Sequence, residues 1–205
     1  MKTKFFIGPM SKNVVDSIIE FNKIRNENVG IIPSRRQVEF NGGYSNNWTT
    51  RGLREYAPSL IIKRDHSGPH QGNIEDDGYK SLREDCNYMD IIHIDPWKKY
   101  PSYKDGLKWT IEMIEYCFKE NSKIKFEVGT EQSIRRFEAH ELDNLMIDLE
   151  KKLSPAMFDN IQYLVIQSGT SLKENENTGE YDQSRLEEMI MICKKNNVLS
   201  KEHNG

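Results

Sequence analysis

The chain has no long apolar run and no paired cysteines. Only a few apolar residues follow the first four positions, whereas a membrane span needs about 20, so neither a signal peptide nor a span is predicted. The three cysteines, Cys86, Cys117 and Cys193, are widely spaced and form no CxxC pair. Such usage favours free thiols over a disulfide framework. The sequence therefore predicts a cytoplasmic protein.

The chain also lacks a strong excess of charge and two common phosphate-binding motifs. With 29 Lys and Arg against 32 Asp and Glu, its formal net charge of −3 argues against a nucleic-acid partner. No glycine-rich dinucleotide fingerprint follows the first predicted strand. No glycine-rich loop ending in Lys-Ser or Lys-Thr is present either, which disfavours a P-loop kinase.

Short apolar runs alternate with stretches of helical periodicity along the 205 residues. Leu107, Ile111, Ile114 and Phe118, for example, recur at helical spacing. Helices are predicted over 14–21, 77–88, 103–119, 138–153 and 185–195. Strands are predicted over 4–9, 29–34, 60–66, 90–95, 123–129, 161–167 and 198–203, and the polar stretch 173–182 is predicted to be a loop.

This alternation predicts an α/β fold with parallel strands joined by right-handed crossovers. We expect one domain over residues 1–205, forming most of a TIM-type (β/α)8 barrel. Seven strands are one short of a closed barrel, and the chain ends just after the seventh. The sequence is therefore expected to be cut from a longer protein before the last strand and helix. A doubly wound open sheet is the competing architecture.

Polar residues gather where the predicted strands end, which is where parallel barrels build their active sites. Alternation along a strand places His93 and Asp95 on one face, and likewise Glu127 and Glu131. Imidazoles and carboxylates that converge in this way can hold a divalent cation, and a further carboxylate can move protons. The sequence alone leaves a second interpretation open, because a lone His or Asp at a strand end is more often a loop cap or a surface residue.

Three further patterns have two interpretations. Asp65 and His66 precede a rigid Gly-Pro turn. They are either a functional pair or residues that only lead into this turn. Arg35 and Arg36 either bind an anionic substrate or are ordinary exposed arginines. The Gly-Gly pair that includes Gly43 either presents backbone amides to a phosphate or forms a turn.

Four motifs together resemble one known family. They are Arg36-Gln-Val-Glu-Phe-Asn-Gly-Gly-Tyr44, Asp65-His-Ser-Gly-Pro69, His93-Ile-Asp95 and Val128-Gly-Thr-Glu131. In order and spacing they resemble the accessory, non-catalytic subunit family of class II D-tagatose-1,6-bisphosphate aldolase. The resemblance runs from about residue 29 to the end of the chain.

The resemblance implies a TIM barrel in carbohydrate metabolism that is related to zinc-dependent class II aldolases. It implies that Asp65 moves protons, that His66 binds a divalent metal, which is zinc in the related aldolases, and that His203 is a second ligand. Barrel geometry adds Glu131 or Asp95 to this set. The residues expected to act or bind are as follows: catalytic Asp65 and Glu131, metal-binding His66 and His203, and substrate-binding Arg36, Gln37, Gly43, Asp95 and Gln167.

Two functions are compatible with the resemblance. One is a metal-dependent lyase that acts on a phosphorylated ketose. The other is an accessory subunit that stabilises an aldolase partner and has no catalytic activity of its own. We expect an oligomer in either case, and a sugar-phosphate kinase ranks third. The pair Arg35-Arg36 departs from the smaller or amide residues usual in the family, which suggests a different anionic group on the substrate.

Overall fold

The computed structural model describes residues 3, 5–173 and 176–203 of an α/β protein with a mostly parallel central sheet. The chain divides into two compact units, which we describe separately. The N-terminal unit comprises Met1–His93 with Glu120–Ile124, and the C-terminal unit comprises Ile94–Lys119 with Lys125–Gly205.

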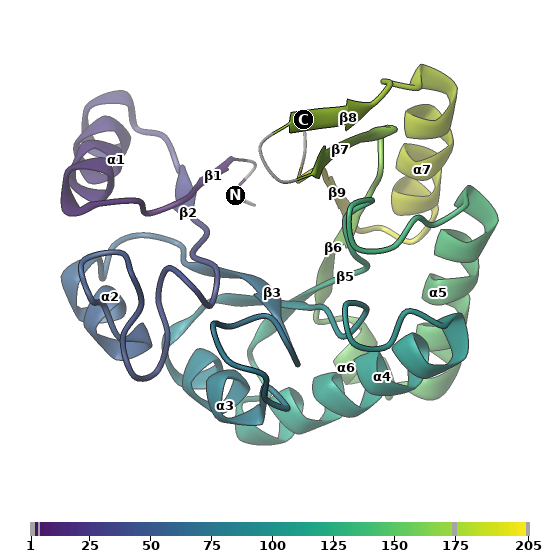
Figure 1. Ribbon diagram of the computed structural model, residues 1–205, viewed down its shortest axis with the longest axis horizontal. Coiled ribbons are helices and arrows are strands. Elements are labelled where there is room, and N and C mark those ends of the chain that lie inside the picture. The colour runs from purple at the N-terminus through teal and green to yellow at the C-terminus, as the bar shows by residue number, and fades with distance from the viewer. Residues whose placement is uncertain (1–2, 4, 174–175, 204–205) are drawn as a thin grey trace. The chain divides into compact units, whose positions relative to one another are not determined.

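The N-terminal unit contains strands and helices in alternation (Figure 1). Its elements are β1 (Phe6–Ile7), α1 (Lys12–Arg25), β2 (Gly30–Ile31), α2 (Thr50–Tyr56), β3 (Lys63–Ser67), α3 (Tyr79–Tyr88) and β4 (Ile91–Ile94), whose last residue begins the other unit. The strand β1 pairs in parallel with β2. Parallel bridges then run from Ile31, in β2, to Ile62, just before β3, and from Ser34, after β2, to Asp65 in β3.

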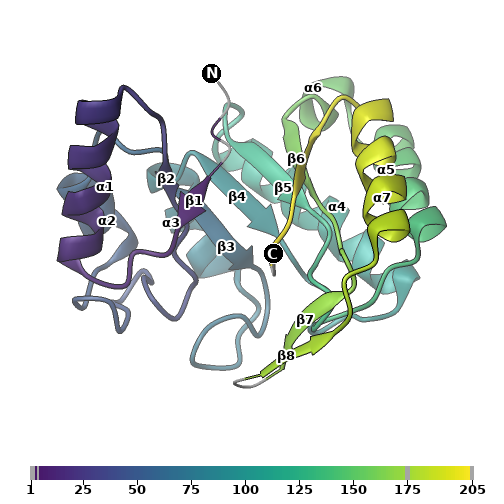
Figure 2. The same ribbon diagram turned by 90° about the horizontal axis from the view of Figure 1, so that it is seen from above.

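The C-terminal unit repeats this alternation and adds an antiparallel hairpin. Its elements are α4 (Tyr103–Glu120), β5 (Lys125–Val128), α5 (Ala139–Lys152), α6 (Pro155–Phe158), β6 (Ile161–Val165), β7 (Thr170–Lys173), β8 (Glu176–Gly179), α7 (Gln183–Lys195) and β9 (Leu199–Lys201). The strands β5, β6 and β9 pair in parallel, and Figure 2 shows α5 and α7 side by side along them. Apolar side chains of these helices and strands, such as Leu149, Leu164 and Met189, are fully buried.

The described strands include all seven predicted parallel strands, although each is shorter than its predicted range. Three features were not predicted: α2, α6 and the β7–β8 hairpin. The hairpin corrects the prediction of a loop over 173–182 in part, because β8 lies within that range. Its strands are mostly polar and show no apolar alternation, so they lack the usual sequence signal of a strand.

Hydrogen bonds do not join the described strands into one closed barrel. Five of them are hydrogen-bonded in the order β3-β4-β5-β6-β9, while β1 and β2 form a separate pair. Among the described residues, no helix combines the length and apolar character that a membrane crossing requires.

A buried ion pair ties β3 to its surroundings in the N-terminal unit. Arg64 and Asp85 are both 0% exposed, and the guanidinium lies 2.7 Å from Asp85 Oδ1. Arg64 also donates to the carbonyl oxygens of Pro33 and Val38 and to Thr50 Oγ1. One side chain thus connects β3 with α2, with α3 and with the segment after β2. Burying a charge is costly unless it is paired and hydrogen-bonded, and here both conditions hold.

We predict that Asp85→Ala destabilises the protein by about 3–5 kcal/mol, because it leaves the Arg64 guanidinium buried without its carboxylate. Urea unfolding followed by circular dichroism would measure this loss. The matched control is Glu55→Ala, which breaks the solvent-exposed pair Arg51–Glu55 and should leave the unfolding midpoint nearly unchanged. Equal midpoints for Asp85→Ala and wild type would contradict the role given to this pair.

Candidate functional site

The carboxyl end of β3 has an unusual backbone conformation. Asp65 N still donates to Pro33 O, at 3.0 Å, as part of the parallel pairing. At the next residue, His66, the backbone turns left-handed, with φ of 43°. A residue with a Cβ pays about 1–2 kcal/mol for this conformation. Such strain persists where surrounding contacts impose it and is concentrated at functional sites.

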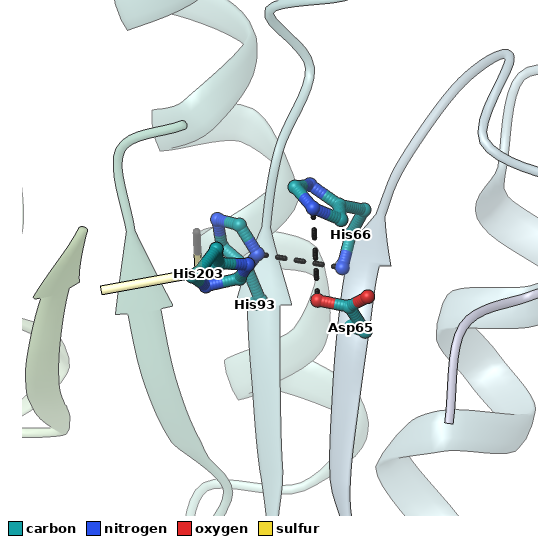
Figure 3. Close-up of side chains that lie close together, drawn as sticks. All are labelled: Asp65, His66, His93 and His203. Carbon is teal, nitrogen blue, oxygen red and sulfur yellow. Dashed lines mark hydrogen bonds and ion pairs between the residues drawn. The ribbon is translucent and has the colours of Figure 1, made fainter. Parts of the chain in front are cut away.

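Three side chains meet at this turn: Asp65, His66 and His93 (Figure 3). Their potential ligand atoms lie within 4.8 Å of one another. The distance between His66 Nε2 and Asp65 Oδ1 is 3.6 Å. The ring of His93, on β4, lies 4.8 Å from the ring of His66, centroid to centroid. One carboxylate and two imidazoles are therefore gathered at the ends of two strands.

His93 also accepts a backbone hydrogen bond. His93 is 0% exposed, and its Nδ1 accepts from His66 N at 3.3 Å (Figure 3). A nitrogen that accepts carries no proton, so a neutral His93 ring is protonated on Nε2. The sequence placed His93 on the same strand face as Asp95 but left it out of the expected site set. Alternation along β4 was the signal available for including it.

Asp95 lies just beyond β4, in the C-terminal unit, and is fully buried. Its Oδ1 accepts from Trp97 N at 3.2 Å, and its Oδ2 accepts from Thr130 Oγ1 at 3.0 Å. These bonds connect the loop after β4 with the loop after β5. In this structure Asp95 thus stabilises two loops of its own unit.

His203 and Glu127 form a close pair in the C-terminal unit. Glu127, on β5, is 0% exposed, and its Oε1 lies 2.8 Å from His203 Nε2. Burial, and then the negative charge of Glu127, raise the pKa of the neighbouring Tyr163 to about 12. A carboxylate on one nitrogen of an imidazole is the usual outer partner of a metal-binding histidine. Glu131, which was predicted to be catalytic, accepts from Ser133 Oγ at 2.7 Å.

Gln167 connects the loop after β5 to α7. Its Nε2 donates to the carbonyl oxygens of Thr130 and Arg135, at 2.8 and 2.9 Å. Its Oε1 accepts from Phe137 N, at 2.9 Å, and from Arg185. Gln167 is only 2% exposed. Both the nitrogen and the oxygen of its side-chain amide are thus hydrogen-bonded within its own unit.

The predicted substrate residues after β2 lie in a compact loop. Gln37 is buried, and its Oε1 accepts from Ser34 N at 2.9 Å. A Cβ on Gly43 would come within 2.1 Å of Gln37 O, so only glycine fits there. The amide of Gly43 donates to Trp48 O. Arg36 is exposed at the surface of this loop.

Arg35, next to Arg36, has a different environment. Arg35 is 2% exposed and donates to Glu39, at 2.7 Å, to Gly68 O and to both oxygens of Asp76. It therefore anchors the loop that follows β3. Of the two arginines, only Arg36 keeps its side chain at the surface.

The donor set of the described cluster fits a divalent cation. Imidazole nitrogens and carboxylate oxygens are the ligands that zinc and similar ions take. Asp65 supplies a carboxylate oxygen and the adjacent His66 an imidazole nitrogen. Metal binding and proton transfer could therefore take place side by side.

The fold is shared with solved structures that include aldolases. No protein-family model matches the chain, and no curated protein sequence matches it significantly. Structures of similar fold include a probable tagatose 6 phosphate kinase from Sinorhizobium meliloti 1021, with a TM-score of 0.79 and 13% identity over 98% of this chain and 58% of that one.

Two aldolases show the same likeness. The YdjI aldolase from Escherichia coli K12 gives a TM-score of 0.67 and 10% identity over 99% of this chain and 67% of that one. The fructose-bisphosphate aldolase of Campylobacter jejuni gives a TM-score of 0.64 and 11% identity over 96% of this chain and 61% of that one. The chain thus spans about 60% of the length of these structures. At such identities the likeness establishes the fold alone.

We predict that the bond between Arg35 and Asp76 stabilises the protein only above acidic pH. Burial raises the pKa of Asp76, but the hydrogen bonds and charge of Arg35 outweigh it, so this pKa falls below its ordinary value of 3.8. A lowered pKa in the folded state means that stability is full above 3.8 and is lost as the pH falls through the lowered value.

Asp76→Asn should therefore cost about 1–3 kcal/mol of unfolding free energy at pH 6. The difference from wild type should shrink at pH 3 and below, where wild-type Asp76 is itself becoming protonated. Urea titrations at several pH values would measure this. A difference that stays constant from pH 6 to pH 2 would contradict the assignment.

Proposed function

We propose that the protein is a metal-dependent lyase acting on a phosphorylated ketose. The observation that carries the proposal is the convergence of Asp65, His66 and His93 at the ends of β3 and β4. In parallel α/β folds, ligands bind where the strands end. The aldolase-related fold supports this class of reaction, and the resemblance in sequence points to the same chemistry.

In this proposal, His66 and His203 hold the divalent metal, for which zinc is the candidate. This choice of ligands is what the resemblance in sequence implies, with His66 at the end of β3 and His203 after β9. When bound, the metal would polarise the ketose carbonyl. Asp65 would take the substrate's hydroxyl proton as the carbon–carbon bond breaks and return it to the carbon that loses the bond, and Glu131 would assist as a second carboxylate.

The five residues that were predicted to bind the substrate would act in two different ways. Arg36, whose side chain is exposed, is the best placed to meet an anionic group. The other four, which are Gln37, Gly43, Asp95 and Gln167, would shape the site through the loops that they stabilise. We also propose that the parallel strands belong to a TIM-type barrel, because their alternation with helices follows that pattern.

An accessory subunit that stabilises an aldolase partner is the second candidate. The hydrogen bonds of Gln167 and Gly43 within the fold favour it, because groups so engaged give a substrate little to bind. A kinase ranks below both, since the sequence has no glycine-rich loop ending in Lys-Ser or Lys-Thr.

We predict that the purified protein binds zinc near one ion per chain and that His66→Ala with His203→Ala abolishes this binding. The reason is that two imidazole ligands are removed from the proposed site. Elemental analysis after dialysis would measure the content. His140→Ala, which removes an exposed histidine of α5, is the matched control and should retain the metal. A folded wild-type protein without metal would favour the accessory role.

We predict that Asp65→Ala lowers turnover of a ketose phosphate by about 10²–10⁴-fold, as expected for loss of a general base. Zinc content should be retained, because the proposed ligands remain. A coupled assay of triose product over a panel of ketose phosphates would measure the rate. Wild-type turnover by Asp65→Ala would remove Asp65 from the mechanism. An inactive wild type that co-purifies with an aldolase, and whose loss destabilises that aldolase, would establish the accessory function.

A further inference from the structure

We propose that His93 is a positioning residue that holds His66 in its left-handed backbone conformation and thereby aims the His66 imidazole. The backbone part of this inference stands on the described geometry of the N-terminal unit. The part that concerns metal binding rests on the proposed function. The two parts can be tested by different measurements.

The backbone amide of His66, within β3, has a side-chain partner. Asp65 N donates to Pro33 O on the neighbouring segment, as a parallel strand should. His66 N instead donates to the His93 side chain, at 3.3 Å. The left-handed φ of His66, 43°, coincides with this change of partner. The amide of the strained residue is thus held by a side chain and not by the sheet.

This bond requires a particular protonation state of His93. The ring is fully buried on β4 and touches the His66 ring, with 4.8 Å between centroids. To accept from an amide, Nδ1 must be unprotonated. That nitrogen is then engaged with the His66 backbone and is not a metal ligand in this arrangement. His93 therefore acts on the proposed ligand His66 through its backbone.

Two substitutions of His93 separate positioning from simple packing. If His93 only fills space, a phenylalanine ring should replace it. If the hydrogen bond accepted by Nδ1 matters, asparagine should replace His93 better than phenylalanine does. The reason is that Asn Oδ1 is the same number of bonds from Cα as His Nδ1. His93→Phe and His93→Asn are therefore a matched pair. His140→Phe, at the exposed histidine of α5, is the control for loss of an imidazole elsewhere.

The backbone part is tested by amide hydrogen exchange at His66, measured by NMR on the full chain without metal. We expect exchange about tenfold faster or more in His93→Phe than in wild type, since the bond that protects the amide is lost. His93→Asn and His140→Phe should stay close to wild type. Equal exchange in wild type and His93→Phe would overturn the inference.

A second measurement covers the case in which His93→Phe does not fold. Long-range 1H–15N spectra of the wild-type imidazoles report which ring nitrogen carries the proton. We expect His93 to be protonated on Nε2 with Nδ1 bare. A proton on Nδ1 would overturn the inference without any variant.

The metal part is tested by calorimetric titration with Zn²⁺. We expect affinity to fall about 10–100-fold in His93→Phe, the usual effect of losing an outer partner of a metal ligand, and to be retained in His93→Asn. Affinity unchanged in both variants would overturn the positioning of the His66 ring. If wild type binds no Zn²⁺, the metal-dependent function and this metal part both fail, while hydrogen exchange still decides the backbone part.

Discussion

The arrangement of the N-terminal unit depends on the buried guanidinium of Arg64. It joins the middle of β3 to Asp85 on α3, to Thr50 at the start of α2 and to two carbonyl oxygens of the segment after β2. A charge buried this completely is tolerable only with full hydrogen bonding. The network therefore fixes where β3 lies, and with it the strand end that presents Asp65 and His66.

His93 and His203 show how a contact at one imidazole nitrogen limits the role of the other. Each ring has two nitrogens, and a contact with one determines what the other can do. In His93 the Nδ1 atom accepts a backbone hydrogen bond, and in His203 the Nε2 atom lies 2.8 Å from Glu127. A histidine near a candidate metal site is thus understood only when the partners of both nitrogens are considered.

Much of the fold could be predicted from the sequence, because apolar runs and helical periodicity report burial directly. The polar hairpin β7–β8 could not, since its strands have no apolar face that would reveal them. In the site, strand-end position pointed to Asp65 and His66. The left-handed turn at His66 was not predictable, since the contact that accompanies it is with His93, 27 positions further along the chain. The burial of Arg35 depends likewise on Asp76, which is distant in sequence.

The alternation of side chains along β3 has a consequence for how this strand tolerates change. Arg64 points to the packed side, where it maintains stability, while its neighbour Asp65 points to the opposite face. A deletion of one residue ahead of this strand would exchange the two faces and move Asp65 into the place of Arg64. It would bring a carboxylate into the pocket built for a guanidinium and remove the candidate base in the same event. Stability and chemistry are thus separable by point substitution along β3 but are lost together by a shift in register.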